Sequence, residues 1–311
     1  MAWEICSKVK TILVSGITLA VLLCIISCTK KVDEVSVESQ SIGMETMINA
    51  RELGGYTSSD GRKVRRGLIL RTARPSTASE NDIRRLTDVY HLATIVDFRM
   101  TSERIEDPSP EIPGVKNVWL RIIDEKLLEE LHKMVEEVKG PQAMPKTPLE
   151  KIQLAFSSGF VSDRMYIDFV SSDQGKSGYQ AFFKELLALP EGKSLLFHCT
   201  QGKDRTGIAA MLILSALDVS EDTILRDYEL TNAFNKALIE KEKQMLAKFG
   251  VTDEAEINKY LSVMDQVNVK YMVNVLDYLK DEYGSVKGYI KNALKITDEE
   301  INQLKISLGY L

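Results

Sequence analysis

The chain has 311 residues, and its 40 Lys and Arg against 45 Asp and Glu give a formal net charge of −5 at pH 7. This acidic balance argues against nucleic acid as a partner, because phosphate backbones are bound by surfaces with excess positive charge. An anionic substrate would instead need a local basic site. With 44% hydrophobic residues, the length fits one core with an inserted subdomain.

The first segment has the layout of an export signal. Lys8 and Lys10 precede a mostly apolar run, 11–26, which is short for a membrane-spanning helix and is followed by Ser27 and Cys28. The Ile-Ile-Ser-Cys sequence resembles a bacterial lipobox, in which the chain is cut before the Cys and lipid is attached to its sulfur. We therefore expect 1–27 to be a lipoprotein signal peptide and Cys28 to tether an exported protein to a bacterial membrane, on its periplasmic or cell-surface side. An uncleaved anchor and an ordinary signal peptide are the alternatives.

Polar and charged residues dominate the next segment, 28–44, which predicts a flexible tether before a folded domain at 45–311. The cysteines agree with this division. Cys6 and Cys24 leave with the signal and Cys28 carries lipid, so that Cys199 is the only free thiol and no disulfide is available. In an oxidising compartment a second cysteine would trap that thiol.

Within the body, strand-like runs alternate with helical ones. The strand-like runs are 92–98, 115–123 and 195–198, and the helical ones are 81–89, 178–188 and 206–217. This alternation predicts an α/β fold with a mostly parallel central sheet flanked by helices. From residue 221 onward the pattern is helical throughout. Helices are expected over 253–264, 267–279 and 298–308.

The sequence HCTQGKDRTG, residues 198–207, lies between an apolar strand-like run at 194–197 and an Ala- and Leu-rich run that predicts a buried helix. In such a loop, unpaired backbone N–H groups and the positive end of the helix dipole converge on one point. A tetrahedral phosphate dianion fits that point. The same field stabilises an anionic sulfur, so we expect Cys199 to be a thiolate nucleophile at neutral pH.

The other residues of this loop suit the same chemistry. Arg205 offers a planar fork for two phosphate oxygens, and Gly202 lets the backbone turn close to the phosphate. The Thr206 hydroxyl can donate to the cysteine sulfur when it leaves, and His198 is expected to hold the loop by hydrogen bonding. We expect the substrate phosphate to be bound by Thr200, Gln201, Gly202, Lys203 and Thr206.

The pattern His-Cys-x2-Gly-Lys-x-Arg-Thr-Gly resembles the signature of the protein tyrosine phosphatase superfamily. Further blocks are similar to the bacterial tyrosine-protein phosphatase family that includes the secreted mycobacterial and listerial tyrosine and lipid phosphatases. These blocks are 49–56, 66–71, 95–99 with Glu103, 227–232 and 283–286. The resemblance implies a protein-tyrosine-phosphatase-like fold with a helical insertion and a helical C-terminal region. It also implies hydrolysis of phosphate monoesters, foremost protein phosphotyrosine, through a phosphocysteine intermediate and without a metal or organic cofactor.

The general acid is the open point of this assignment. The resemblance favours Asp204, because similar enzymes use the Asp in that place of the loop. Asp124 follows a strand-like run, where other superfamily members carry a mobile Asp, and is the second candidate. Asp97 also ends a strand-like run, but Arg99 and Glu103 lie close to it in the sequence, which favours an ion pair.

Two further features bear on the substrate. Residues 127–138 have helical spacing, and the resemblance suggests that about 125–160 form a lid over the site; a helix packed on the flank is the alternative. Phosphatases that act on phosphoinositides often carry Lys at the position of Lys203, so a phosphoinositide or inositol-phosphate phosphatase with the same loop is the second hypothesis. A sulfurtransferase, or a phosphate-ester binding protein that does not turn over, is the alternative from another class.

Overall fold

The computed structural model describes residues 33, 35–126, 133, 147–157, 162 and 164–309, and Val35–Leu311 form one compact unit. The expected signal peptide and Cys28 lie outside the described residues, as does most of the segment expected to form a lid. No helix in the described part of the chain is both long and apolar enough to cross a membrane.

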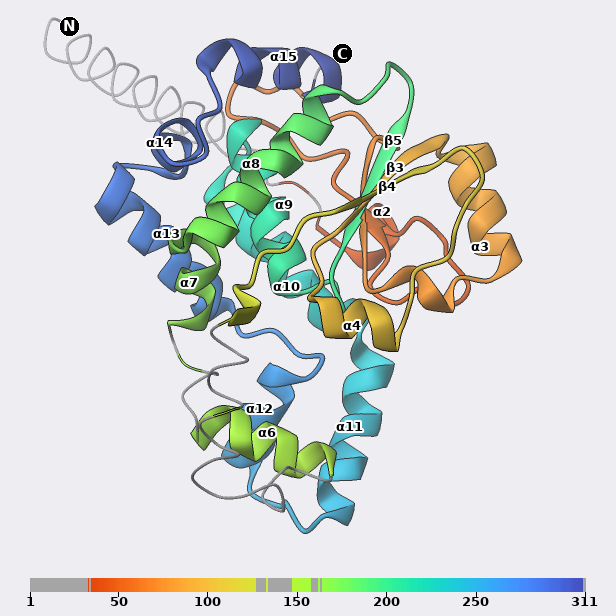
Figure 1. Ribbon diagram of the computed structural model, residues 1–311, viewed down its shortest axis with the longest axis vertical. Coiled ribbons are helices and arrows are strands. Elements are labelled where there is room, and N and C mark those ends of the chain that lie inside the picture. The colour runs from red at the N-terminus through yellow and green to blue at the C-terminus, as the bar shows by residue number, and fades with distance from the viewer. Residues whose placement is uncertain are drawn as a thin grey trace, which may run out of the picture. The chain divides into compact units, whose positions relative to one another are not determined.

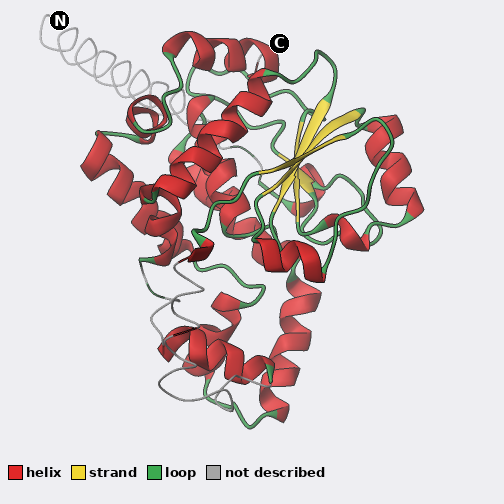
Figure 2. Ribbon diagram, in the orientation of Figure 1, coloured by secondary structure: helices red, strands yellow, loops and turns green. Residues whose placement is uncertain are grey.

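A five-stranded sheet forms the centre of the unit (Figure 1, Figure 2). The strands are β1 Arg51–Glu52, β2 Ile69–Thr72, β3 Leu92–Asp97, β4 Lys116–Trp119 and β5 Ser194–His198. They lie in the order β1-β2-β5-β3-β4, with β1 antiparallel to β2 and all other neighbours parallel. β5 is the central strand, so the chain that leaves it emerges between its neighbours at the carboxyl ends of the parallel strands. Ligands of such sheets bind at that end.

Helices surround this sheet. Before β5 in the chain they are α2 Val37–Gln40, the one-turn η1 Pro75–Thr77, α3 Glu80–Arg84, η2 Arg85–Val89, α4 Thr101–Glu106, α6 Pro148–Ser157, α7 Met165–Ser171 and α8 Asp173–Leu187. After β5 they are α9 Arg205–Ala216, α10 Glu221–Phe234, α11 Lys236–Lys248, α12 Glu254–Val263, α13 Val269–Tyr283, α14 Val286–Asn292 and α15 Asp298–Gly309. The predicted class, a mostly parallel sheet flanked by helices, is confirmed.

The side chains of β5 alternate between two hydrophobic cores, because successive residues of a strand point to opposite faces. Leu195 and Phe197 belong to the larger core with α8 and α9, and Leu196 belongs to a smaller core on the other face. Phe182 of α8 lies 5.1 Å from Phe197, centroid to centroid. Burial on both faces explains why this strand is a continuous apolar run. The site that follows it rests on a rigid element.

A third core is formed by α6, α11 and α12, which Figure 1 shows grouped together. Leu246 of α11 and Leu261 of α12 are fully buried in it, and Phe156 of α6 packs against it. We call these three helices the helical lobe. It contains α6, the longest described stretch of the segment expected to form a lid, which packs on helices from the C-terminal half of the chain.

Two sequence expectations differ from the structure. The strand expected over 115–123 ends at Trp119, because β4 pairs only with β3 and its register partner there, Asp97, is the last residue of β3. The folded unit begins at Val35 rather than at 45. The side chain of Gln40 in α2, only 1% exposed, donates to the carbonyls of Glu52 and Gly54, which fixes this part of the expected tether to the sheet.

Candidate active site

The loop between β5 and α9 carries the residues singled out in the sequence. Cys199 follows the end of β5 and is completely buried, and Arg205 opens α9 with 6% of its surface exposed. Gly202 has a φ of +65°, and a Cβ on it would lie 2.4 Å from the Thr72 carbonyl oxygen. Only glycine therefore fits, both for its backbone conformation and for the close approach to β2.

The carbonyls of this loop are held from behind. The Arg74 N–H donates to Thr200 O at 3.0 Å. The Asn49 amide donates to Gln201 O and to Gly202 O, at 3.2 and 3.0 Å. Within the described residues, no backbone carbonyl accepts the N–H groups of residues 200–206. With its carbonyls turned back, the loop presents its N–H groups to its other side, which is the arrangement that binds an anion at a helix N-terminus.

A buried ion-pair network stands behind the same carbonyls. Arg71 donates to Gly202 O at 2.8 Å and to Asp227 at 2.7 Å. Asp227 also accepts from Arg51 at 3.1 Å and from the Tyr56 hydroxyl at 3.0 Å. Burial opposes ionisation of Asp227, but the two guanidinium groups outweigh it and hold the pKa of Asp227 below its ordinary value. Two cations against one carboxylate leave a net positive charge beneath the loop.

Arg205 is held in place by Glu103 of α4. Its Nη1 and Nη2 donate to the two Glu103 carboxylate oxygens at 2.7 and 2.8 Å, and Nη1 also lies 3.3 Å from Phe98 O. The Thr200 hydroxyl donates to the same carboxylate. Burial raises the pKa of Glu103, but the hydrogen bonds and charge of Arg205 outweigh it and lower that pKa to about 2. A guanidinium has five donors, so Arg205 retains donors for a phosphate.

The ammonium of Lys203 contacts backbone carbonyls at the end of α12 and in the segment after it. Lys203 is 1% exposed and donates to Ser262 O at 2.8 Å and to Gln266 O at 3.2 Å. Its Nζ is 4.0 Å from the nearer Asp204 oxygen. In this structure its charge thus ties the loop to the helical lobe, instead of facing a bound phosphate as the sequence had suggested.

The two candidate acids lie in different surroundings. Asp204 precedes α9 and accepts a hydrogen bond from the buried Tyr166 hydroxyl. Asp124 is exposed in the chain after β4, where its carboxylate accepts the Lys126 N–H at 3.1 Å. Asp97 pairs with Arg99 at 2.9 Å, as its sequence context had indicated. Of the three carboxylates, Asp204 is the one within the loop itself.

His198 and Thr206 lie at the two ends of the loop, and each has a buried side-chain atom, Nε2 and Oγ1, that has no hydrogen-bond partner in the described part of the chain. His198 Nδ1 lies 3.0 Å from Cys199 O. A carbonyl only accepts, so this nitrogen carries the proton, and the predicted role of His198 in holding the loop agrees with this contact. The pKa of His198 is lowered by burial, which Asp97 only partly offsets. Thr206 Oγ1 is buried without a hydrogen-bond partner among the described residues, so the expected bond to the Cys199 sulfur is not formed here.

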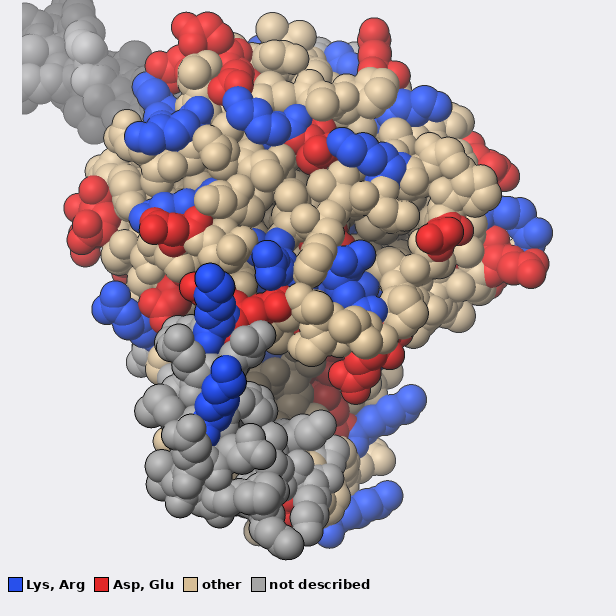
Figure 3. All heavy atoms as spheres, viewed as in Figure 1, with Lys and Arg blue, Asp and Glu red and all other residues tan. Residues whose placement is uncertain are grey.

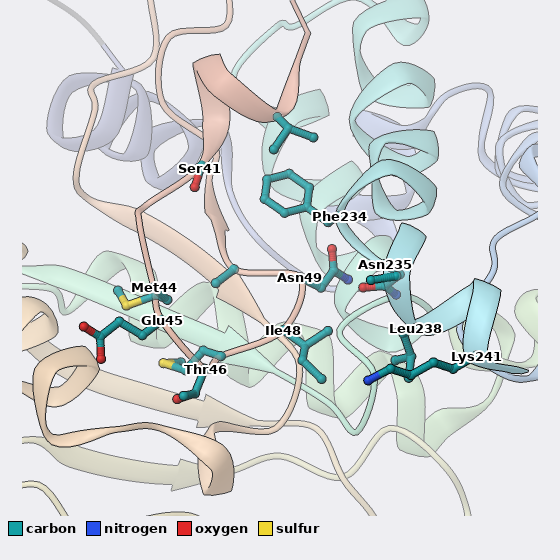
Figure 4. Close-up of a pocket in the computed structure, with 14 residues that line it drawn as sticks. Ser41, Met44, Glu45, Thr46, Ile48, Asn49, Phe234, Asn235, Leu238 and Lys241 are labelled. Atoms are coloured by element: carbon teal, nitrogen blue, oxygen red, sulfur yellow. The ribbon is translucent and has the colours of Figure 1, made fainter.

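A pocket of about 410 Å³ lies behind the loop, between residues 37–50 and 234–241. Figure 4 shows Asn49, Asn235 and Lys241 around it. It touches the loop through Asn49, which lines the pocket and also donates to the loop carbonyls. Among the described residues no group of three or more His, Cys, Asp or Glu is placed to hold a metal ion.

Sequence reasoning gave no role to the residues behind the loop. Asn49, Arg71 and Asp227 stood in blocks that resemble a family, and Tyr166 carried no signal at all. Arg71 is in β2 and Asp227 in α10, far apart in the sequence. The placement of β2 beside β5 brings Arg71 to the loop, and Asp227 pairs with Arg71 there.

The Arg205–Glu103 pair predicts a pH dependence of stability. Because the pKa of Glu103 falls from 4.5 to about 2 on folding, its contribution is complete above pH 4.5 and is lost as the pH falls to about 2. Glu103→Gln should lower the free energy of unfolding by roughly 3 kcal/mol at pH 7. Urea titrations at pH 7, 4 and 2.5 would measure this, with Glu106→Gln as control. A difference that does not shrink toward low pH would contradict the assignment.

Comparison with known proteins agrees with this geometry. The sequence profile of the family described as "Tyrosine phosphatase family" matches residues 42–309. A Cupriavidus necator protein named as a tyrosine-protein phosphatase is 31% identical over 255 residues, 82% of this chain and 84% of that protein. A tyrosine-protein phosphatase of Nostoc commune is 28% identical over 168 residues, 53% of this chain and 54% of its own length.

A third relative is the triple specificity protein phosphatase PtpB of Mycobacterium tuberculosis. It is 26% identical over 132 residues, which cover 40% of this chain and 48% of that protein. The family match extends from the segment before β1 to the last described helix, so it includes the loop and every residue that holds it. The chain therefore belongs to the tyrosine phosphatase family and is a phosphatase.

Proposed function

We propose that the protein hydrolyses protein phosphotyrosine through a phosphocysteine intermediate on Cys199. The observation that carries this proposal is the orientation of the loop at residues 199–205. Its carbonyls are bound from behind, no backbone carbonyl in the described part of the chain accepts the N–H groups of residues 200–206, and Arg205 is fixed by Glu103. A phosphate placed there would be surrounded by preorganised donors that do not need to reorient during the reaction.

The first chemical step forms a bond between the Cys199 sulfur and phosphorus and breaks the bond between phosphorus and the ester oxygen. The electron pair of the broken bond stays on that oxygen, which takes the proton of Asp204. In the second step the Asp204 carboxylate accepts a proton from water as the water oxygen attacks phosphorus. The sulfur–phosphorus bond then breaks, the thiolate is restored, and Asp204 is protonated again.

Burial of the nucleophile favours a long phosphorylated side chain. Cys199 has no exposed surface, so a phosphate must enter the loop to reach its sulfur. A phenyl ring carries the phosphate farther from the peptide backbone than the short side chain of phosphoserine does. Figure 3 shows acidic and basic side chains interspersed over the face in view. Such a surface has no extended field of one sign, so the anion would be attracted by the loop itself.

The second hypothesis, a phosphoinositide or inositol-phosphate phosphatase, depends on Lys203. Its ammonium is occupied by the carbonyls of Ser262 and Gln266, which is an observation against a direct contact with a second phosphate. We therefore place phosphotyrosine first.

The N-terminal sequence supports a further part of the proposal, that the enzyme is exported and tethered through lipid on Cys28. The support is the apolar run 11–26 after two lysines and the Ile-Ile-Ser-Cys sequence that ends it. Diacyl attachment at one cysteine gives stable membrane binding, whereas a single chain does not.

Removing the nucleophile tests the mechanism. Cys199→Ser should lower hydrolysis of p-nitrophenyl phosphate by roughly a thousandfold or more, because a hydroxyl is a far weaker nucleophile than a thiolate at neutral pH. Asp204→Asn should spare p-nitrophenyl phosphate and slow phenyl phosphate by about 100-fold, since only the poorer leaving group needs a proton. Asp124→Asn is the matched control. Rates unchanged in Cys199→Ser would refute the phosphocysteine route.

A substrate panel tests the choice between the two hypotheses. We expect phosphotyrosine peptides to be hydrolysed with a higher kcat/KM than phosphoserine peptides, inositol phosphates or phosphoinositides. Lys203→Met should lower kcat/KM for all of them by a similar factor, because it removes the bonds that hold the loop and not a contact to one particular substrate. A selective loss on the polyphosphorylated substrates would instead favour the inositol-phosphate hypothesis.

Expression in a bacterium tests the anchor. Wild-type protein should sediment with membranes and incorporate labelled palmitate, whereas Cys28→Ala should incorporate none. Cys24→Ala, four residues earlier in the apolar run, is the control and should still be labelled. Equal labelling of the Cys28→Ala variant would exclude lipid attachment at this residue.

A further inference from the structure

Two buried tyrosines form a chain of hydroxyl groups that ends on Asp204. The Tyr166 hydroxyl donates to Asp204 Oδ1, and it lies 2.8 Å from the Tyr228 hydroxyl. Each tyrosine is 1% exposed, whereas the Asp204 side chain retains 18% of its surface. Asp204 is thus held on its inner side by Tyr166 and reaches solvent on its outer side.

The direction of this chain follows from the acceptor at its end. An ionised carboxylate only accepts hydrogen bonds, so Tyr166 donates to Asp204 and accepts from Tyr228. Both phenols keep their protons, because burial, reinforced by the Asp204 charge, raises their pKa well above the ordinary value. With Oδ1 engaged by Tyr166, the proton of the acid form belongs on Oδ2, the oxygen left for the substrate.

Aromatic packing fixes the position of Tyr166, which donates to Asp204. The Tyr166 ring, from α7, stacks on Tyr271 of α13 at 5.2 Å with an interplanar angle of 18°. It meets the Tyr228 ring of α10 edge to face at 6.4 Å and 86°, and the Phe169 ring lies 5.7 Å away. Three helices therefore set the position of one hydroxyl, which leaves the Asp204 carboxylate little freedom to rotate.

We propose that Tyr166, supported by Tyr228, is a positioning residue for general acid catalysis: it fixes the Asp204 carboxyl so that Oδ2 presents the proton to the leaving oxygen. This inference rests on the proposed function, in which Asp204 is the acid. The other charged groups beside Asp204 are Lys203, whose Nζ is 4.0 Å from Oδ1, and Arg205. Neither can replace the tyrosine, because Lys203 is held by the carbonyls of the helical lobe and Arg205 by Glu103.

The test compares two substrates that differ in leaving group. In Tyr166→Phe, kcat/KM for phenyl phosphate should fall by about tenfold or more, while that for p-nitrophenyl phosphate changes by less than about threefold. Tyr228→Phe should act in the same direction by a smaller factor. The ratio of the two rates is measured in one preparation, so a variant that folds incompletely still gives a valid ratio.

Two controls separate this role from a structural one. Tyr271→Phe keeps the stacked ring and should leave the ratio unchanged. In an Asp204→Asn background, Tyr166→Phe should have no further effect on the ratio, because the acid through which it acts is gone. An equal loss on both substrates, or a further change of the ratio in that background, would overturn the inference. Neither result would contradict the phosphocysteine mechanism, which is tested separately by Cys199→Ser.

Discussion

The bond from Arg71 to the Gly202 carbonyl, together with that from Asn49, is the constraint on which the site depends. A peptide unit has its N–H and C=O on opposite sides, so binding the carbonyl from behind turns the N–H groups next to it toward the open side of the loop. Gly202 makes this possible, because any side chain there would collide with β2. The loop geometry that we propose to bind an anion is therefore produced by contacts on the opposite side of the loop.

The charges behind the loop act in the same sense. Arg205 and Glu103 neutralise each other, whereas Arg51 and Arg71 share the single carboxylate of Asp227. Burial and the neighbouring Arg51 lower the pKa of Arg71 to about 10, which still leaves it charged at neutral pH. A buried cation without a matching anion is unfavourable, so the charge behind the loop favours a negative group within it.

The parts of this site that follow one another along the chain were predicted from the sequence. The strand, the loop and the helix at 194–216 follow one another in the chain, so their local pattern was enough to place Cys199 and Arg205 together. Local pattern could not predict that Asp227, from α10, would pair with Arg71 behind the loop, because the two residues are 156 positions apart in the sequence. Nor could it predict the direction of Lys203, which is set by carbonyls more than fifty residues farther along. The strand at β4 was predicted too long, because its length is limited by the end of β3, and the residues of β4 do not reveal where β3 ends.

Glu103 and Asp204 are two carboxylates of the candidate site that lie in different surroundings. Glu103 meets a guanidinium, whose charge holds its pKa near 2, so it stays ionised and serves as a fixed support for Arg205. Asp204 meets a phenol, which offers a hydrogen bond without a charge. An acid that must be recharged in every cycle cannot be paired with a cation as closely as Glu103 is. In the mechanism proposed above, the neutral tyrosine orients the Asp204 carboxyl without placing a cation against it.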